Sequence, residues 1–273
     1  MSWEVVARKD FQDSVRSRWL QGLTVLFVVL VAGVIWVLRP GPGETVSSNQ
    51  VLNSLLLKDA LVTTLVPLIA LVVAYNAVVG ERESGSLKLL LSLPHSRADV
   101  VAGKVIGRSA AFGVAVFVGF LLPALALALG PLQFEVGSFV GFTLLTALLG
   151  AVFVAIAVGA SAAVPSNTLA IGITVGLYFL FVPLWGAVQL PLQFYFQVSS
   201  PPAWLPLTGQ EVIRLLRLIN PTGAFKIVTN AYLGSTLFAG DGARLHVGAT
   251  AMLLAWLLAP PLFGLWRFDR ADL

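Results

Sequence analysis

The stretch ERESGSLKLLLSLPHSRADVVAGKVIGR, residues 81–108, is a charged segment between two strongly apolar parts of the chain. Its first half is rich in leucine and stops at Pro94, because proline cannot continue a helix. Its second half opens with Ser96 and Asp99, a pattern typical of a helix N-terminus. The segment therefore predicts a helix–break–helix hairpin. Its leucines have to be buried against the rest of the chain or against another protein: Leu87, Leu89, Leu90, Leu91 and Leu93.

The composition is that of a membrane protein. The chain has 273 residues, of which 58% are apolar and 11% are charged, whereas a soluble domain carries about 25% charged residues. The mean hydropathy is +0.90. The absence of cysteine excludes disulfides and cysteine nucleophiles. We expect the net charge of +4 to reflect membrane orientation and not binding to nucleic acid.

Six apolar stretches are long enough to cross a bilayer, which requires about 20 residues. We expect both chain ends and the hairpin on the cytoplasmic side of a prokaryotic plasma membrane, because eleven of the seventeen Lys and Arg residues fall on that side. The predicted spans are Leu20–Leu38, Ala60–Val79, Ser109–Leu129, Val136–Val164, Asn167–Leu190 and Val247–Trp266. The sequence thus predicts an all-α, multi-pass membrane protein in contact with the lipid bilayer.

Two further segments lie outside these spans. Residues 1–19 place Trp3, Ala7, Phe11, Val15 and Trp19 at intervals of four, which predicts an amphipathic helix in the membrane interface. Residues 191–243 form an outer loop. Within it, Thr208 and Glu211 have the spacing of a capping box at the start of a short amphipathic helix. We expect the dipeptide Asn220-Pro221 to stop that helix.

The predicted spans contain almost no ionisable side chains. Carriers driven by protons or sodium usually place such a group at membrane depth, because coupling requires it. The sequence therefore argues against an ion-driven carrier and favours an energy source outside the bilayer.

The hairpin resembles the cytoplasmic signature of ABC type-2 permeases. That signature has the form E-x-E-x-G-[ST]-L-x-x-L-L-x-x-P-x-[ST]-R followed by G-K, and the order of spans and loops along the chain is similar as well. The nearest branch is the one that includes the permease of the nitrous-oxide-reductase maturation system. The resemblance implies one transmembrane permease domain over residues 1–273, with residues 80–108 as a cytoplasmic coupling-helix hairpin.

In that family the hairpin docks on a separate ATP-binding-cassette ATPase, which binds ATP and Mg. The permease itself needs no cofactor and no metal, and it pairs as a homodimer or heterodimer. Export of a hydrophobic or amphipathic substrate is the implied function. The residues that would form or brace the docking surface are Glu81, Glu83, Gly85, Leu87, Leu90, Pro94, Ser96, Arg97 and Lys104.

Three other functions were weighed. A membrane scaffold that transmits force without moving a solute would need the same hairpin, so this alternative stays open. An intramembrane serine protease would use Ser161 and His246, but these residues fall near opposite ends of their spans. ATP hydrolysis by the chain itself is not expected, because Gly103-Lys104 lacks the other residues of a phosphate-binding loop: Ala98 and Val105 take their places.

Overall fold

The computed structural model describes residues 2–38, 47–128, 134–199, 201–202, 204 and 206–271. The regular elements among them are all helices. Six helical stretches are long and apolar enough to span a membrane. The predicted all-α membrane fold with six spans is therefore confirmed, although the expected end of the third span at Leu129 lies outside the described residues.

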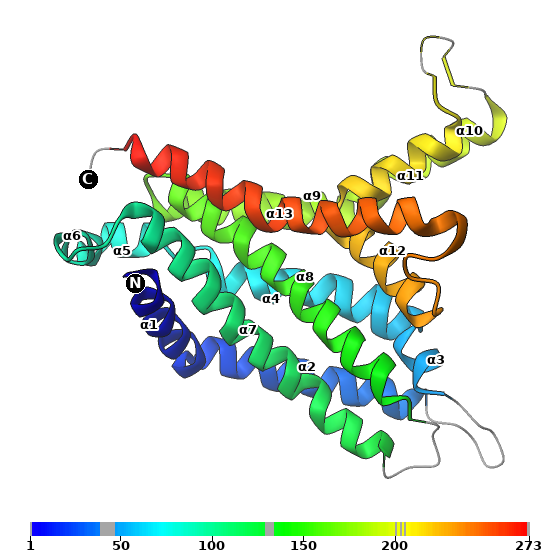
Figure 1. The fold of residues 1–273 in the computed structure, drawn as a ribbon, viewed down its shortest axis with the longest axis horizontal. Coiled ribbons are helices and arrows are strands. Elements are labelled where there is room, and N and C mark those ends of the chain that lie inside the picture. Colours follow the sequence, from blue (N-terminus) through cyan, green and yellow to red (C-terminus); the bar gives the residue numbers. More distant parts are fainter. Residues whose placement is uncertain are drawn as a thin grey trace.

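Shorter helices precede the first, second, third and sixth spans, whereas the third, fourth and fifth spans follow one another directly (Figure 1). The spans are formed by α2 (Arg18–Val37), η1 with α4 and α5 (Leu55–Val62, Thr63–Ala74 and Val79–Glu83), α7 (Arg97–Ala128), α8 (Val136–Ala163), α9 with α10 (Asn167–Phe181 and Pro183–Val198) and η2 with α13 (Gly240–Gly242 and Ala243–Asp269). The other helices are α1 (Ser2–Arg16), α3 (Ser48–Leu52), α6 (Ser86–Ser92), α11 (Gly209–Ile219) and α12 (Pro221–Leu233).

Helix α8 is the centre of the bundle and packs against α4, α7, α12 and α13 (Figure 1). Small residues allow the closest approaches, as in other membrane helix pairs. A Cβ atom on Gly159 would lie 2.3 Å from the carbonyl oxygen of Pro260, and one on Gly264 would lie 2.3 Å from that of Gly159. The segment around Ser161 therefore serves helix packing.

The second span begins earlier than the sequence predicted. Helix η1 is a π-helix that starts at Leu55, so Lys58 and Asp59 belong to the helical stretch and not to the loop before Ala60. Both side chains have polar partners that compensate their charge within the helical stretch. Asp59 pairs with Lys226 of α12 at 2.8 Å, and Lys58 donates hydrogen bonds to the side-chain oxygens of Asn53 and Asn230.

The fifth span bends at Val182 and continues as α10 to Val198, past the predicted start of the outer loop at Pro191. The predicted capping box is present at the start of α11. The pair Asn220-Pro221 ends α11, as expected, but it also starts α12, which the sequence analysis missed. The Asn220 side chain accepts from the backbone N–H groups of Thr222 and Gly223.

Helix α1 packs along α7 and not only against a membrane surface. Val6 and Ala7 are buried, whereas Trp19, predicted on the apolar stripe of this segment, belongs to α2 and is 75% exposed. The contact depends on two glycines of α7. A Cβ atom on Gly103 would lie 2.7 Å from the Val6 Cβ, and one on Gly107 would lie 2.4 Å from the Ala7 carbonyl oxygen.

We predict that Gly159→Val lowers the thermal stability of the detergent-solubilised protein, because the new side chain would collide with the backbone of Pro260. Overpacking of this kind costs about 1–3 kcal/mol. Gly172→Val in α9 is the matched control, since nothing lies within 4 Å of a Cβ atom there. Equal melting temperatures for the two variants would contradict the packing seen between α8 and α13.

Candidate functional site

The hairpin between the second and third spans consists of α5, α6 and the first turn of α7. Gly85 joins α5 to α6 with φ +76°, in the left-handed region that glycine adopts without strain. Pro94 lies between α6 and α7. Ser96 and Asp99 form the predicted cap of α7: the Asp99 carboxylate accepts from the Ser96 backbone N–H at 2.9 Å, and the Ser96 hydroxyl accepts from the Asp99 N–H at 3.0 Å.

The leucines of the hairpin divide into two groups. Leu87 is fully buried, and Leu90 and Leu91 pack partly against the core of the bundle. Leu89 is 72% exposed and Leu93 is 54% exposed. Of the predicted docking residues, Glu83, Pro94 and Ser96 are exposed and Gly85 is half-buried. The hairpin therefore presents an apolar tip that the chain itself does not cover.

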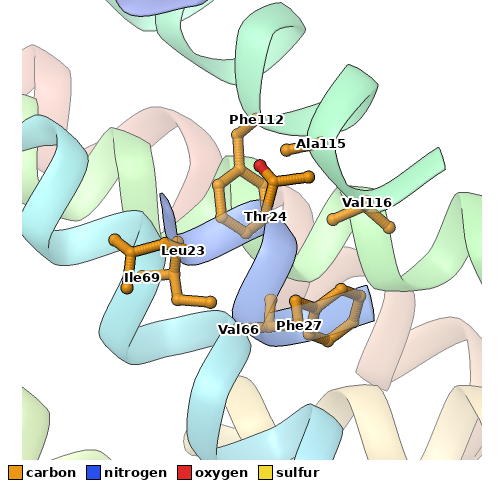
Figure 2. Close-up of a pocket in the computed structure, with 8 residues that line it drawn as sticks. All are labelled: Leu23, Thr24, Phe27, Val66, Ile69, Phe112, Ala115 and Val116. Carbon is orange, nitrogen blue, oxygen red and sulfur yellow. The ribbon is translucent and has the colours of Figure 1, made fainter. Parts of the chain in front are cut away.

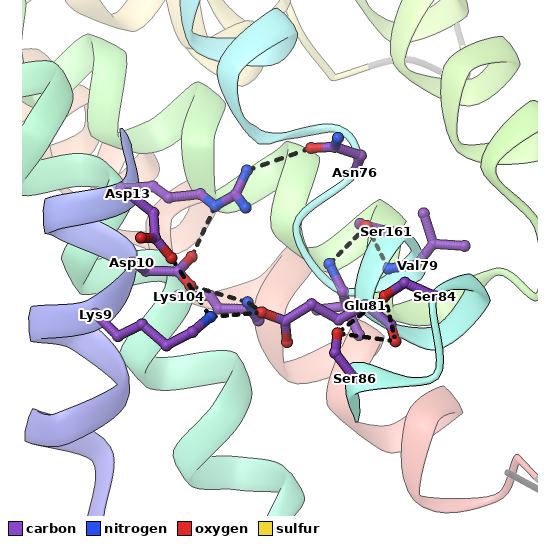
Figure 3. A network of polar contacts seen from close by, with 12 residues as sticks. Lys9, Asp10, Asp13, Asn76, Val79, Glu81, Ser84, Ser86, Lys104 and Ser161 are labelled. Atoms are coloured by element: carbon purple, nitrogen blue, oxygen red, sulfur yellow. Dashed lines mark hydrogen bonds and ion pairs between the residues drawn. The ribbon is translucent and has the colours of Figure 1, made fainter. Parts of the chain in front are cut away.

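Besides Leu87, two of the predicted docking residues, Lys104 and Glu81, are held in an ion cluster beneath the hairpin. Lys104 is fully buried, and its ammonium group lies 2.9 Å from a carboxylate oxygen of Asp10 in α1 and 2.9 Å from one of Glu81 in α5 (Figure 3). Lys9 reaches the same Glu81 oxygen at 3.0 Å. Arg108 completes the cluster by pairing with Asp10 at 2.8 Å. Lys104 and Glu81 thus brace the hairpin instead of forming its surface.

The charges of this cluster determine the protonation of Asp10. Burial by itself raises the pKa of the Asp10 carboxyl, but the positive charges of Lys104 and Arg108 and their hydrogen bonds outweigh that effect. Its pKa therefore lies below the ordinary value, and Asp10 is ionised at neutral pH. A buried ion cluster of this kind loses much stability when one partner is removed.

The other side of the hairpin is tied to the turn between α8 and α9. Arg82 donates to the carbonyl oxygen of Val164 at 3.0 Å, and Glu83 accepts from the backbone N–H of Asn167 at 2.7 Å. The buried Ser161 hydroxyl accepts from the N–H groups of Val78 and Val79, at 3.1 Å each (Figure 3). The turn lacks a basic residue but contacts the hairpin through its backbone.

Arg97 ties the start of α7 to the end of α13. It donates to the carbonyl oxygens of Phe268 and Ala271, and its guanidinium lies 4.9 Å from the centre of the Phe268 ring. The guanidinium of Arg82 also lies over the Phe268 ring, 5.3 Å from its centre. Helix C-termini carry partial negative charge, which favours cations there. Arg97 therefore holds the hairpin in place.

The structure gives no support to a serine protease. Both polar groups that such an enzyme would need have structural partners. The Ser161 hydroxyl accepts two backbone hydrogen bonds in the core, and Nδ1 of His246 accepts from the backbone N–H of Phe238 at 3.2 Å.

Sequence reasoning missed Asp10, Arg82 and Arg108 as parts of the site. Asp10 had a detectable signal, since it is an acidic residue among the apolar positions of the N-terminal helix. Gly103 and Gly107, four residues apart in a predicted helix, marked the groove that receives this helix.

Comparison with known proteins agrees with this architecture. Residues 4–273 match the family described as ABC-2 family transporter protein. The chain belongs to this family. A probable ABC transporter permease protein, NosY of Stutzerimonas stutzeri, is 35% identical over 263 residues, which cover 92% of each chain. NosY of Pseudomonas aeruginosa is 34% identical over 263 residues, covering 93% of this chain and 91% of the relative.

These matches confirm the resemblance inferred from the hairpin motif. The protein is an ABC-2 permease, a multi-pass membrane subunit whose family implies an ATPase partner. The relatives are themselves permeases of ABC transporters.

We predict that Asp10→Asn destabilises the protein by about 3–5 kcal/mol, because it leaves buried Lys104 with one carboxylate fewer. Asp13→Asn is the matched control. Asp13 is on the same helix, but its side chain is 64% exposed and pairs only with exposed Lys9 at 3.5 Å. This control should change stability by about 0.5 kcal/mol or less. Thermal unfolding in detergent measures both, and a control as unstable as Asp10→Asn would contradict the role of the cluster.

A second prediction concerns pH. The pKa of Asp10 is lower in the folded protein than in the unfolded chain. The stabilisation is therefore fully present above the unfolded value of about 4, and it is lost as the pH falls through the lowered folded value. Melting temperatures of the wild type should fall more steeply below pH 4 than those of Asp10→Asn. Parallel curves for the two proteins would exclude Asp10 as a contributor to acid sensitivity.

Proposed function

We propose that this permease moves a hydrophobic or amphipathic substrate outward across the plasma membrane, driven by ATP that a separate ATPase subunit binds with Mg and hydrolyses. The exposed leucines of the hairpin carry the proposal. Leu89 on α6 and Leu93 directly after it are exposed, and charged side chains such as Lys88 flank them. An apolar ridge with charged edges fits a groove on a partner protein.

The attachment of the hairpin favours transmission of force. Docking on α6 would push on α5 and α7, and these helices are joined to α1 through the buried ion cluster. Arg82 and Arg97 extend the same connection to α8 and α13. A rigid link between a docking surface and the spans is what a coupling helix requires.

The composition of the spans favours ATP as the energy source and a substrate with little charge. Charged residues of the observed spans, such as Lys58, Asp59 and Lys104, lie toward the span ends and have polar partners within the chain, whereas no Asp, Glu, Lys or Arg occurs in residues 60–79, 109–129, 136–164, 167–190 or 247–266. Because ion-coupled carriers rely on such groups at membrane depth, their absence supports coupling through the hairpin.

Two copies of the permease would supply the pathway. The apolar cavity among α2, α4 and α7 has a volume of about 10 Å³ and is lined by residues such as Leu23, Val66 and Phe112 (Figure 2). It has room for one water molecule at most. In contrast, few residues of the span formed by α9 and α10 are buried. This exposed face is available to a second permease, as a homodimer or heterodimer, or to lipid.

We predict that Leu89→Asp with Leu93→Asp abolishes co-purification of the permease with its ATPase. The change places two charges on a surface that has to become buried, while both side chains are exposed in the free chain, so the bundle should keep its stability. The ATPase is the ATP-binding-cassette protein that co-purifies with the wild type. Its amount per permease, measured after affinity purification in detergent, is the readout.

Val5→Asp is the control. Val5 is 62% exposed on α1, on the same side of the bundle as the hairpin but outside it. This variant should keep the ATPase. Unchanged association in the double hairpin variant, with normal membrane insertion, would refute docking at this site.

A further inference from the structure

The end of the bundle opposite the hairpin carries an arm that has no role in the proposed docking. Helices α10 and α11 extend away from the other helices there (Figure 1). None of the described side chains of either helix is fully buried. The indole of Trp256 in α13 anchors α11 to the bundle by donating to the Ile219 carbonyl oxygen, and the indole of Trp185 in α10 joins the two helices of the arm by donating to the Leu216 carbonyl oxygen.

A cavity of about 500 Å³ lies along the arm, between α10, α11 and the neighbouring parts of α12 and α13. Its polar lining comes from Gln193 and Gln197 of α10 and from Arg214 and Arg217 of α11. The two arginines are three residues apart and therefore lie on one face of the helix. Amide and guanidinium groups together form a set of hydrogen-bond donors suited to an anion.

The charged side chains that line this cavity are all positive. No carboxylate lines it, and among the described residues neither arginine makes an ion pair. The nearby Glu211 is engaged elsewhere, because its carboxylate accepts from the backbone N–H of Thr208 at 2.7 Å and from its hydroxyl at 2.8 Å. These hydrogen bonds and, less strongly, the charge of Arg214 hold the pKa of Glu211 below its ordinary value. Glu211 therefore offsets part of the Arg214 charge without an ion pair, and the remaining positive charge of the two arginines is available to a ligand.

The rest of the lining is apolar. Phe196, Ile213, Ile227 and Leu245 form the other part of the cavity wall. A small inorganic anion would gain nothing from these side chains. A molecule with an anionic head and a hydrocarbon part would contact both kinds of surface.

The surface of the arm places the cavity next to lipid. Phe194, Val198 and Trp204 are 65%, 87% and 79% exposed. Soluble surfaces rarely expose apolar side chains in such density, whereas aromatic residues concentrate where a membrane protein meets the headgroup region. The arginines then lie at the depth of lipid phosphates.

We propose that the cavity between α10 and α11 binds an anionic phospholipid from the adjacent leaflet, with its phosphate on Arg214 and Arg217 and its acyl chains against the apolar wall. The proposal does not depend on ATPase docking or on transport. It gives the arm a lipid anchor that fixes its position relative to the bundle.

Native mass spectrometry of the purified permease in neutral detergent tests this proposal. Titration with phosphatidylglycerol should show binding at least tenfold tighter than with phosphatidylcholine. Replacing both arginines, Arg214→Gln with Arg217→Gln, should weaken phosphatidylglycerol binding about 10- to 30-fold, since each basic residue near a lipid surface contributes about 1 kcal/mol. Arg214→Lys with Arg217→Lys should retain most of the binding, because the charge is kept.

Arg244→Gln is the matched control, because Arg244 is an exposed arginine of α13 near the same end of the bundle and does not line the cavity. It should bind phosphatidylglycerol like the wild type. Equal affinity in the wild type and the double glutamine variant, or an equal loss in Arg244→Gln, would overturn the proposal.

Two further measurements distinguish the source of the anion and guard against misfolding. Millimolar inorganic phosphate should not displace phosphatidylglycerol; displacement would assign the site to free anions and overturn the lipid. In the wild type alone, phosphatidylglycerol should raise the melting temperature more than phosphatidylcholine does. An equal effect of the two lipids would also overturn the proposal, even if the double variant fails to fold.

Discussion

The ammonium group of Lys104 is buried, and this fact constrains the whole hairpin end of the molecule. Among the described residues, the carboxylates that compensate its charge come from two other elements, Asp10 in α1 and Glu81 in α5. Separating these partners would leave an unpaired charge in the protein interior, at a cost of about 3–5 kcal/mol. The ion cluster therefore holds α1, α5 and α7 together.

Close packing of α1 against α7 supports the ion cluster. Gly103 and Gly107 let α1 approach the backbone of α7, which brings Asp10 within reach of Lys104 and Arg108. Gly159 and Gly264 do the same for α8 and α13. The glycines of the span formed by α9 and α10 make no such contacts, and few residues of this span are buried. The chain thus combines a tightly joined core with one loosely attached span, and the loose span is the part free to face another molecule.

The sequence was sufficient for the large features. Apolar runs located six spans because a bilayer demands about 20 such residues, and the leucine run ended by Pro94 located the hairpin. The sequence alone could not assign the roles of side chains whose partners lie on distant segments of the chain. Lys104 and Arg97 belong to the motif, but only the fold shows that they face Asp10 and the end of α13. Helix α12 was missed because Asn220-Pro221 resembles a stop, although the same pair is also well suited to start a helix.

The second span is anchored by polar groups at both of its ends. At the inner end, Glu81 is bound to Lys104. At the outer end, the π-helix places Lys58 and Asp59 side by side toward α12, where they meet Asn230 and Lys226, residues four apart on one face of that helix. Because both anchors are charged or charge-assisted and partly buried, they resist sliding along the membrane normal. The polar clusters at the two ends of the second span therefore link the hairpin end of the bundle, through η1 and α12, with the end that carries α10 and α11.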